Sequence, residues 1–267
     1  DDPRSADRLE AMLRRVVGPP IEVVDDARFE EELKAFGRRD ALERGGLVRR
    51  SREKDLVAFG HAFGGDIFPG YAYDELRNGR RELTQNGVLC HTAVEVQTVV
   101  GCPFDCTYCP YIAFVCIRMD VENLVERITR TALARRSQRL WKLNNRSDTL
   151  GLEPEYGLAA PLVERFAELE GNVLMLYSKG DSVEHLAGLD HRKKTVASFT
   201  LTPELVASLL EVGAPPPSQR LAAIRRLGAA GYPILVRFSP IVPLRGWRES
   251  YESLVERLFA AATPEMI

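Results

Sequence analysis

Three cysteines on one short stretch are the residues most able to do chemistry. Cys102, Cys106 and Cys109 are separated by three and then two residues, between Gly101 and Pro110. This spacing lets three thiolates converge on one soft metal centre, either zinc, copper(I) or an iron–sulfur cluster. A structural zinc site takes four closed ligands, and no second Cys/His pair has suitable spacing. The spacing favours a 4Fe–4S cluster with one open iron; zinc, or a disulfide plus a spare thiol, is the alternative.

This loop resembles the cluster motif of the radical S-adenosylmethionine superfamily, Cys-x3-Cys-x2-Cys. An aromatic residue before the last cysteine is usual there, and Tyr108 stands at that position. The resemblance implies that the three cysteines hold a 4Fe–4S cluster and that S-adenosylmethionine chelates the open iron. One electron from the cluster then cleaves the cofactor to a 5′-deoxyadenosyl radical, which the protein must orient.

A more specific resemblance covers roughly the C-terminal two thirds of the chain. The segment from Leu140 to Tyr251 is similar to the spore photoproduct lyase family of that superfamily. The matching pieces are Ser147-Asp148-x-Leu150-Gly151, Ser178-Lys179, Glu184-His185-Leu186, Lys194-Thr195-x-x-Ser198-Phe199, Gln219-Arg220-Leu221-Ala222-Ala223, Gly231-Tyr232, Pro240-Ile241 and Gly246-Trp247. The helix around Arg220 is generic to the superfamily, whereas the ordered set is far more specific.

Several residues match positions that hold the cofactor in that family. The resemblance assigns Ser147 and Asp148 to the cofactor's amino group and Lys179 to its carboxylate, and their charges suit these partners. The alternatives are a helix cap for Asp148 and an exposed surface position for Lys179.

Three further positions match the family less specifically. Thr200 stands where the family has a serine and keeps the hydroxyl, although strand propensity alone also explains a threonine. Tyr108 and Ile241 would line the adenine ring, with core packing as the alternative for both.

One position departs from the family. The lyase's hydrogen-donating cysteine would fall at Asn145, where this chain has no thiol. The spare cysteines, Cys90 and Cys116, have apolar neighbours and are expected to be packing thiols. The sequence therefore argues against thymine-dimer repair by the lyase mechanism. Asn144 and Asn145 instead suit hydroxyl or amino groups of a polar small molecule.

These residues predict a radical S-adenosylmethionine enzyme of the lyase or dehydratase type. The resemblance extends to related radical S-adenosylmethionine dehydratases that deoxygenate aminoglycosides, and it implies dehydration and deoxygenation of an aminosugar diol in antibiotic biosynthesis. Polar groups of the barrel lumen would be catalytic: Glu95, Asn144, Asn145 and Arg237. One alternative is a spore photoproduct lyase-like DNA repair enzyme with another hydrogen donor. The other is a metal-bearing module whose basic run, residues 49–54, contacts nucleic acid.

Alternating strand and helix patterns must position these side chains. Strands are predicted over 93–100, leading into the cysteine loop, and over 140–144, 173–178, 195–201 and 234–238. Intervening helices are predicted from about residue 121, over 161–169 and 183–189, after Thr202 and Ser218 as N-caps, and over 247–261. This alternation indicates parallel βαβ units. We expect an α/β fold with a partial (β/α)6 TIM-like barrel over 92–267, whose chemistry lies on loops at the C-terminal strand ends. Residues 1–91 would form a helical and loop-rich extension, with 61–91 as a lid.

Composition limits the class of protein. The 267 residues are 45% hydrophobic and 28% charged, which is ordinary for a soluble enzyme. A net charge of −2 provides no general basic field for nucleic acid. Three of the five cysteines fall in one loop, which favours a reducing compartment. We expect a cytoplasmic enzyme with no signal peptide or membrane span. Its partners would be a small-molecule substrate and an electron donor such as flavodoxin, ferredoxin or another reductase; nucleic acid is not expected.

Overall fold

The computed structural model describes residues 3–14, 55–59, 93–109, 114–134 and 139–267. The basic run 49–54, the predicted lid 61–91 and Cys90 lie outside the described residues. Within the described part of the chain, no helix combines the length and apolar character needed to cross a membrane.

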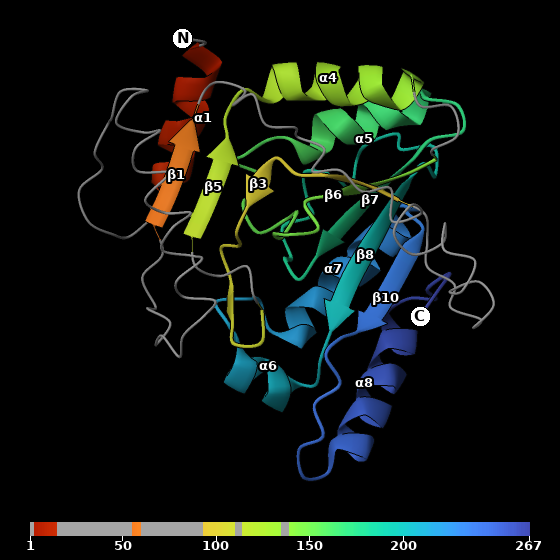
Figure 1. Cartoon of the computed structure of the whole chain (residues 1–267). Coiled ribbons are helices and arrows are strands. Elements are labelled where there is room, and N and C mark those ends of the chain that lie inside the picture. The colour runs from red at the N-terminus through yellow and green to blue at the C-terminus, as the bar shows by residue number, and fades with distance from the viewer. Residues whose placement is uncertain (1–2, 15–54, 60–92, 110–113, 135–138) are drawn as a thin grey trace, which may run out of the picture.

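A five-stranded sheet forms the centre of the molecule, with the strand order β10-β8-β7-β6-β2. All four neighbouring pairs are parallel. Figure 1 shows the strands side by side, so their carboxyl ends meet at one edge of the sheet. The strands are β2 (Val94–Val96), β6 (Leu140–Leu143), β7 (Val173–Ser178), β8 (Thr195–Leu201) and β10 (Ile234–Phe238).

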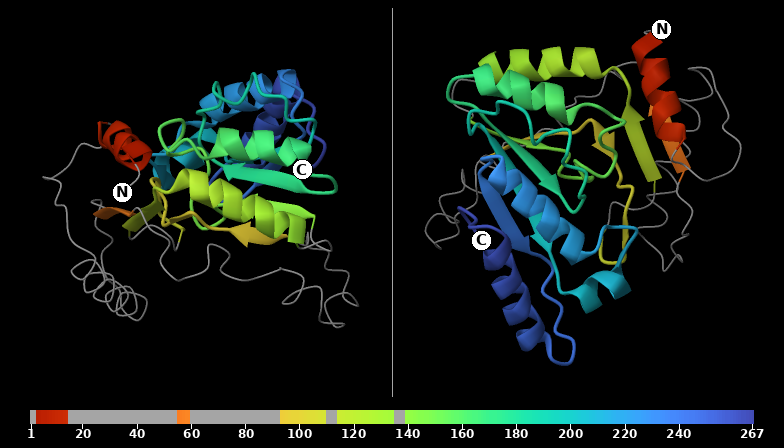
Figure 2. Two further views of the ribbon diagram at one scale, coloured as in Figure 1. Left: turned by 90° about the horizontal axis from the view of Figure 1, so that it is seen from above. Right: turned by 180° about the vertical axis from the view of Figure 1, so that it is seen from behind.

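Helices cover one face of this sheet. α5 (Ala159–Glu168) contacts β7, and α7 (Pro217–Ala229) contacts β8 and β10. α4 (Val121–Ala134) packs on α5, and α8 (Trp247–Ala261) packs on α7. Figure 1 shows the strands in front of α7, and the rear view in Figure 2 shows the helices in front. The helices bury apolar stripes at helical spacing, such as Leu221, Ile224 and Leu227 of α7.

Strand residues alternate between two environments, as the period of two requires. One set joins the helices in the apolar core, including Val96, Trp141, Leu176, Phe199 and Val236. The alternate set points to the opposite face of the sheet, which we call the polar face. Its polar and aromatic members are Glu95, Lys142, Tyr177, Ser198, Thr200 and Arg237, which form register pairs 95–142, 177–198 and 200–237; Met175, Val196 and Leu235 lie on the same face.

Two smaller sheets flank the central one. β5 (Phe114–Arg118) lies between β1 (Asp55–Phe59), parallel to it, and β3 (Val99–Val100), antiparallel to it. β4 (Asp105–Cys106) pairs antiparallel with β9 (Glu211–Val212).

Part of the predicted extension lies against the C-terminal region. The strand β1 pairs with β5, as Figure 1 shows. Helix α1 (Pro3–Leu13) is tied to the start of α4, because Arg8 donates to the Met119 carbonyl at 2.7 Å and to Glu122 at 2.8 Å. The boundary near residue 91 stays a prediction.

The α/β class and the parallel βαβ organisation are confirmed; the described residues form an open sheet of five parallel strands. The strand predicted over 93–100 is divided into β2 and β3. The helix predicted over 183–189 is a series of turns. Thr202 and Ser218 are not N-caps: α6 (Glu204–Leu210) begins after Pro203, and α7 begins at Pro217. Proline suits the first turn of a helix, where its missing N–H is not needed.

Candidate cofactor and substrate site

The cysteine loop, residues 101–109, follows β3 and is fixed by backbone contacts. Gly101 begins it with φ of 83°, a conformation that glycine adopts without strain. Cys106 pairs with Glu211 in the β4–β9 ladder, and the Thr107 N–H donates to the Leu210 carbonyl at 2.8 Å. The loop is therefore attached to the segment between α6 and α7, more than a hundred residues away in sequence.

The thiols of the cysteine loop share one apolar environment. Cys102 and Cys106 are buried with Phe104, and Cys109 packs against them. None of the three forms a disulfide. Burial raises the pKa of both Cys102 and Cys106. Bound iron would replace the protons, because a coordinating thiol is deprotonated outright.

A cluster fits this donor set better than a single ion does. Among the described residues, no group of three His, Cys, Asp or Glu side chains is placed to hold one metal ion. A cubane cluster is wider than one ion and accepts thiolates that lie farther apart. Three thiols in an apolar loop therefore fit a 4Fe–4S cluster.

Asn144 directly follows β6 and positions the strand that leads into the cysteine loop. Its φ of 52° is left-handed, a conformation that asparagine tolerates better than most residues. Its Oδ1 accepts hydrogen bonds from the Thr98 N–H at 2.8 Å, the Val99 N–H at 3.2 Å and the Thr98 hydroxyl at 3.1 Å. These bonds divide the predicted strand at residues 97–98, and they engage the amide oxygen that was expected to meet substrate.

Asp148 joins the loops that follow β6 and β7. Its carboxylate accepts from the Ser178 hydroxyl at 2.5 Å, the Lys179 N–H at 2.6 Å and the backbone N–H groups of Leu150 and Gly151. Burial raises the pKa of Asp148, and these hydrogen bonds oppose that effect. Both oxygens are thus engaged with the protein. The adjacent Ser147 Oγ is buried and has no hydrogen-bond partner among the described residues, so it fits the predicted contact with an ammonium better.

Lys179 and Tyr108 meet beside the cysteine loop. The Lys179 Nζ lies 5.5 Å from the centre of the Tyr108 ring and 4.0 Å from Glu211 Oε1. The Lys179 side chain is only 16% exposed, so the surface alternative for this lysine is wrong. The Tyr108 hydroxyl donates to Glu211 Oε1 at 2.5 Å. Burial, and then the Glu211 carboxylate, raise the pKa of Tyr108.

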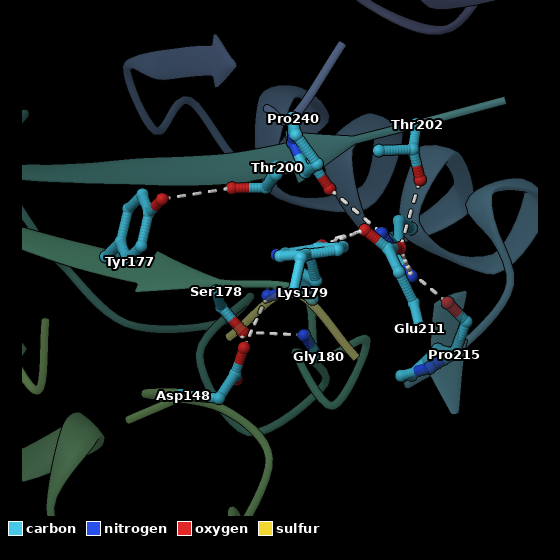
Figure 3. Close-up of polar contacts among 12 residues, drawn as sticks. Asp148, Tyr177, Ser178, Lys179, Gly180, Thr200, Thr202, Glu211, Pro215 and Pro240 are labelled. Atoms are coloured by element: carbon cyan, nitrogen blue, oxygen red, sulfur yellow. Dashed lines mark hydrogen bonds and ion pairs between the residues drawn. The ribbon is translucent and has the colours of Figure 1, made fainter. Parts of the chain in front are cut away.

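Glu211 and Arg220 form a buried ion pair that sequence reasoning missed. The Arg220 Nη2 lies 2.6 Å from Glu211 Oε2, and both side chains are fully buried. Figure 3 shows Glu211 between Lys179 and Thr202, whose hydroxyl donates to Oε2 at 3.0 Å. Arg220 also donates to the carbonyls of Pro215 and Thr200. The sequence signal for this pair was an arginine next to the apolar stripe of α7. Such an arginine is expected to be buried, and a buried cation needs a carboxylate partner.

The polar face carries a second group of contacts at the ends of β2 and β6. The Asn145 Nδ2 donates to Glu95 Oε1 at 2.6 Å, and the Arg146 Nε lies 3.8 Å from Glu95 Oε2. Gln97 accepts from the Arg146 N–H at 3.3 Å, whereas its buried Nε2 has no partner among the described residues. A carboxylate-bound amide therefore occupies the place predicted for the lyase's thiol.

The remaining predicted residues lie along β7, β8 and β10. The Arg237 guanidinium lies 4.7 Å from the centre of the Tyr177 ring, and the Thr200 hydroxyl donates to the Tyr177 hydroxyl at 3.3 Å (Figure 3). Ile241 is 58% exposed, so burial does not support core packing there. The cysteines, Tyr108, Asp148 and Lys179 come together at one end of the sheet, and Arg237 contacts Tyr177 instead.

Comparison with known proteins identifies the family. The family model for spore photoproduct lyase matches residues 89–266, which include the cysteine loop and the whole central sheet. The chain belongs to the spore photoproduct lyase family. It is 27% identical over 171 residues to the spore photoproduct lyase of Bacillus subtilis (strain 168), covering 60% of this chain and 49% of that protein. It is 27% identical over 112 residues to the spore photoproduct lyase of Geobacillus sp. (strain Y412MC61), covering 42% of this chain and 33% of that protein.

Solved structures of spore photoproduct lyase share the fold. A variant with bound S-adenosylmethionine and dinucleoside spore photoproduct aligns with a TM-score of 0.58 at 21% identity, covering 63% of this chain and 52% of that one. Another variant aligns with a TM-score of 0.62 at 18% identity, covering 81% and 63%. This chain spans about half the length, or less, of the curated relatives that it matches.

Membership of the spore photoproduct lyase family confirms the predicted superfamily. It also confirms the expected cofactor pair, a 4Fe–4S cluster and S-adenosylmethionine. The roles of individual residues in holding these cofactors stay predictions.

Proposed function

We propose that this chain carries the radical S-adenosylmethionine core of an enzyme that acts on a thymine lesion in DNA, as a member of the spore photoproduct lyase family. The match over residues 89–266 carries this proposal. Three solved structures of spore photoproduct lyase hold dinucleoside spore photoproduct, so the expectation that nucleic acid is not a partner loses its support. The predicted aminosugar dehydration receives no support from these relatives, so the DNA-repair alternative becomes the preferred function.

The chain's own residues would hold the cofactors as follows. Cys102, Cys106 and Cys109 would ligate the cluster, Ser147 would accept from the cofactor's ammonium and Lys179 would pair with its carboxylate. When bound, the cluster and cofactor supply a 5′-deoxyadenosyl radical that takes a hydrogen atom from carbon. Asp148 would act indirectly, because its oxygens fix the backbone on which Lys179 stands.

The polar face would bind the lesion. A thymine ring presents carbonyl oxygens and an imide N–H. The unpartnered Gln97 Nε2 can donate to such a carbonyl, and the Glu95 carboxylate can accept from an imide N–H. Asn145 would hold Glu95 in place through its 2.6 Å hydrogen bond. Because an amide N–H gives up a hydrogen atom far less readily than a thiol does, hydrogen return must come from a group other than residue 145.

The test uses the anaerobically reconstituted chain with S-adenosylmethionine, a reductant and dinucleoside spore photoproduct. We expect 5′-deoxyadenosine to form and the photoproduct to be consumed. Neither should happen with the Cys106→Ala variant. If an aminosugar diol stimulated cofactor cleavage and the photoproduct did not, the DNA-repair function would be wrong.

A second experiment tests the role of position 145. Asn145→Cys restores a thiol where the family's hydrogen donor is expected, with Asn145→Ser as the matched control that cannot donate a hydrogen atom readily. We expect Asn145→Cys to raise the fraction of photoproduct that ends as intact thymidine. An equal product distribution for the two variants would show that residue 145 takes no part in returning the hydrogen atom.

A further inference from the structure

A fully buried carboxylate lies where the cysteine loop, the end of β7 and helix α7 meet. Glu211 begins β9, opposite Cys106 in the ladder, and its side chain is fully buried. A buried charge is strongly unfavourable unless it is paired and hydrogen-bonded. The partners of this carboxylate therefore indicate what it does.

The two oxygens of Glu211 face different parts of the molecule. Oε2 takes the Arg220 ion pair at 2.6 Å and the Thr202 hydroxyl at 3.0 Å, both from the helix and strand scaffold. Oε1 takes the Tyr108 hydroxyl at 2.5 Å and lies 4.0 Å from the Lys179 Nζ. One carboxylate thus connects the rigid scaffold to the cysteine loop and to the predicted cofactor lysine.

The difference in distances matters for Lys179. Arg220 is held by two backbone carbonyls and lies close enough to neutralise Glu211 from the scaffold side. The longer 4.0 Å separation leaves Lys179 near the carboxylate without a tight ion pair. Lys179 can therefore turn to a second carboxylate without breaking a strong contact.

We infer that Glu211 is a positioning residue that couples the cysteine loop to Lys179. Through Oε1 it holds Tyr108 against the scaffold and keeps Lys179 within reach of an incoming carboxylate. The inference deepens the proposed function and rests on it for the identity of that carboxylate, which belongs to S-adenosylmethionine.

The test replaces both members of the buried pair, Glu211→Gln with Arg220→Met. Each single change would leave one buried charge of this pair without its partner, Arg220 or Glu211, whereas the double variant removes both charges and is therefore expected to fold. The matched control applies the same two substitutions to an exposed ion pair of 3.1 Å on neighbouring helices, Glu204→Gln with Arg257→Met.

The first measurement needs no cofactor. Hydrogen exchange of residues 103–109 in the cluster-free protein should be at least about threefold faster in the buried-pair variant and unchanged in the control. Unchanged exchange in the buried-pair variant would show that Glu211 does not hold the loop, whatever the protein's reaction is.

The second measurement is S-adenosylmethionine affinity at equal iron content. We expect the buried-pair variant to bind S-adenosylmethionine about tenfold more weakly than wild type. Because Glu211 acts through Lys179, the triple variant that also carries Lys179→Met should bind no more weakly than Lys179→Met alone. Affinity equal to wild type, or additive losses, would overturn the coupling to Lys179. If the wild-type protein itself failed to bind S-adenosylmethionine, the proposed function would fail, and the exchange result alone would decide the role of Glu211 in the loop.

Discussion

Asn144 combines an unusual backbone conformation with three accepted hydrogen bonds. Asn144→Ala removes the acceptor from the buried Thr98 and Val99 N–H groups, at a cost of about 1–3 kcal/mol. It also places alanine at a φ of 52°, which costs roughly 1–2 kcal/mol more. Asn144→Gly loses the acceptor and avoids the strain. We expect urea unfolding to rank wild type above Gly and Gly above Ala; equal stability of the two variants would contradict the strain contribution.

The three cysteines of the cysteine loop are predicted to determine the iron and sulfide content of the protein. Replacing Cys102, Cys106 or Cys109 by alanine should abolish the brown absorbance and most bound iron and sulfide, because a cubane cannot be held by two thiolates. Cys116→Ala is the control and should retain both. Loss of the cluster in the Cys116 variant would mean that the ligand set is different from the one predicted.

Residue type and position were enough to predict part of the candidate site. Three closely spaced cysteines and a lysine at a strand end can be recognised locally, and they do lie together. Glu211 could not be recognised this way, because its contact with Tyr108 joins residues 103 positions apart. The sequence also shows that Asp148 is acidic without showing that main-chain N–H groups take up its oxygens.

At the scale of elements, Gly151 lets the loop after β6 approach the cysteine loop closely. A Cβ at this position would lie 2.8 Å from Pro103 Cγ and 3.1 Å from the Phe104 ring. Gly151→Ala should therefore displace the cysteine loop and lower cluster retention at least about twofold, with little change in far-ultraviolet circular dichroism. Gly188→Ala is the matched control, because a Cβ there meets nothing within 4 Å. Equal iron content in the two variants would show that the cysteine loop accommodates the methyl group.

Local patterns predicted the main elements and failed where tertiary contacts decide. The central strands and α5, α7 and α8 follow from apolar alternation and spacing. Residues 183–189 form turns, although their apolar spacing is typical of a helix. The spacing has another cause, because the turns bury Val183 and Leu186 in the core. β1 was not predicted, because its strand conformation depends on pairing with β5, whose residues lie 59 positions further along the chain.

At the scale of the whole molecule, the C-terminal residues cover the open edge of the central sheet. Glu265 donates its N–H to the Ile234 carbonyl at 2.9 Å and accepts the Ile234 N–H at 2.5 Å, and the Val236 N–H donates to Met266. Glu265→Pro removes the N–H and the carboxylate together and should expose the β10 edge. Unpaired edges favour association between chains. We expect concentration-dependent self-association by light scattering.

The control for this edge prediction is Glu256→Ala, on the exposed side of α8. It removes one carboxylate from the same end of the chain and should stay monodisperse. Equal behaviour of the two variants would show that the β10 edge needs no cover.

The division of the central strands into two faces has an evolutionary consequence. Side chains such as Trp141 are locked by the surrounding core, so substitutions there are selected for folding. The neighbouring positions on the polar face, Glu95 and Lys142 among them, point away from the helices that cover the other face, so substitutions there leave the helix-packed core intact. A lineage can therefore exchange reactive groups one at a time while keeping the scaffold. The amide at Asn145, where relatives are expected to have a thiol, is the kind of exchange that this arrangement permits.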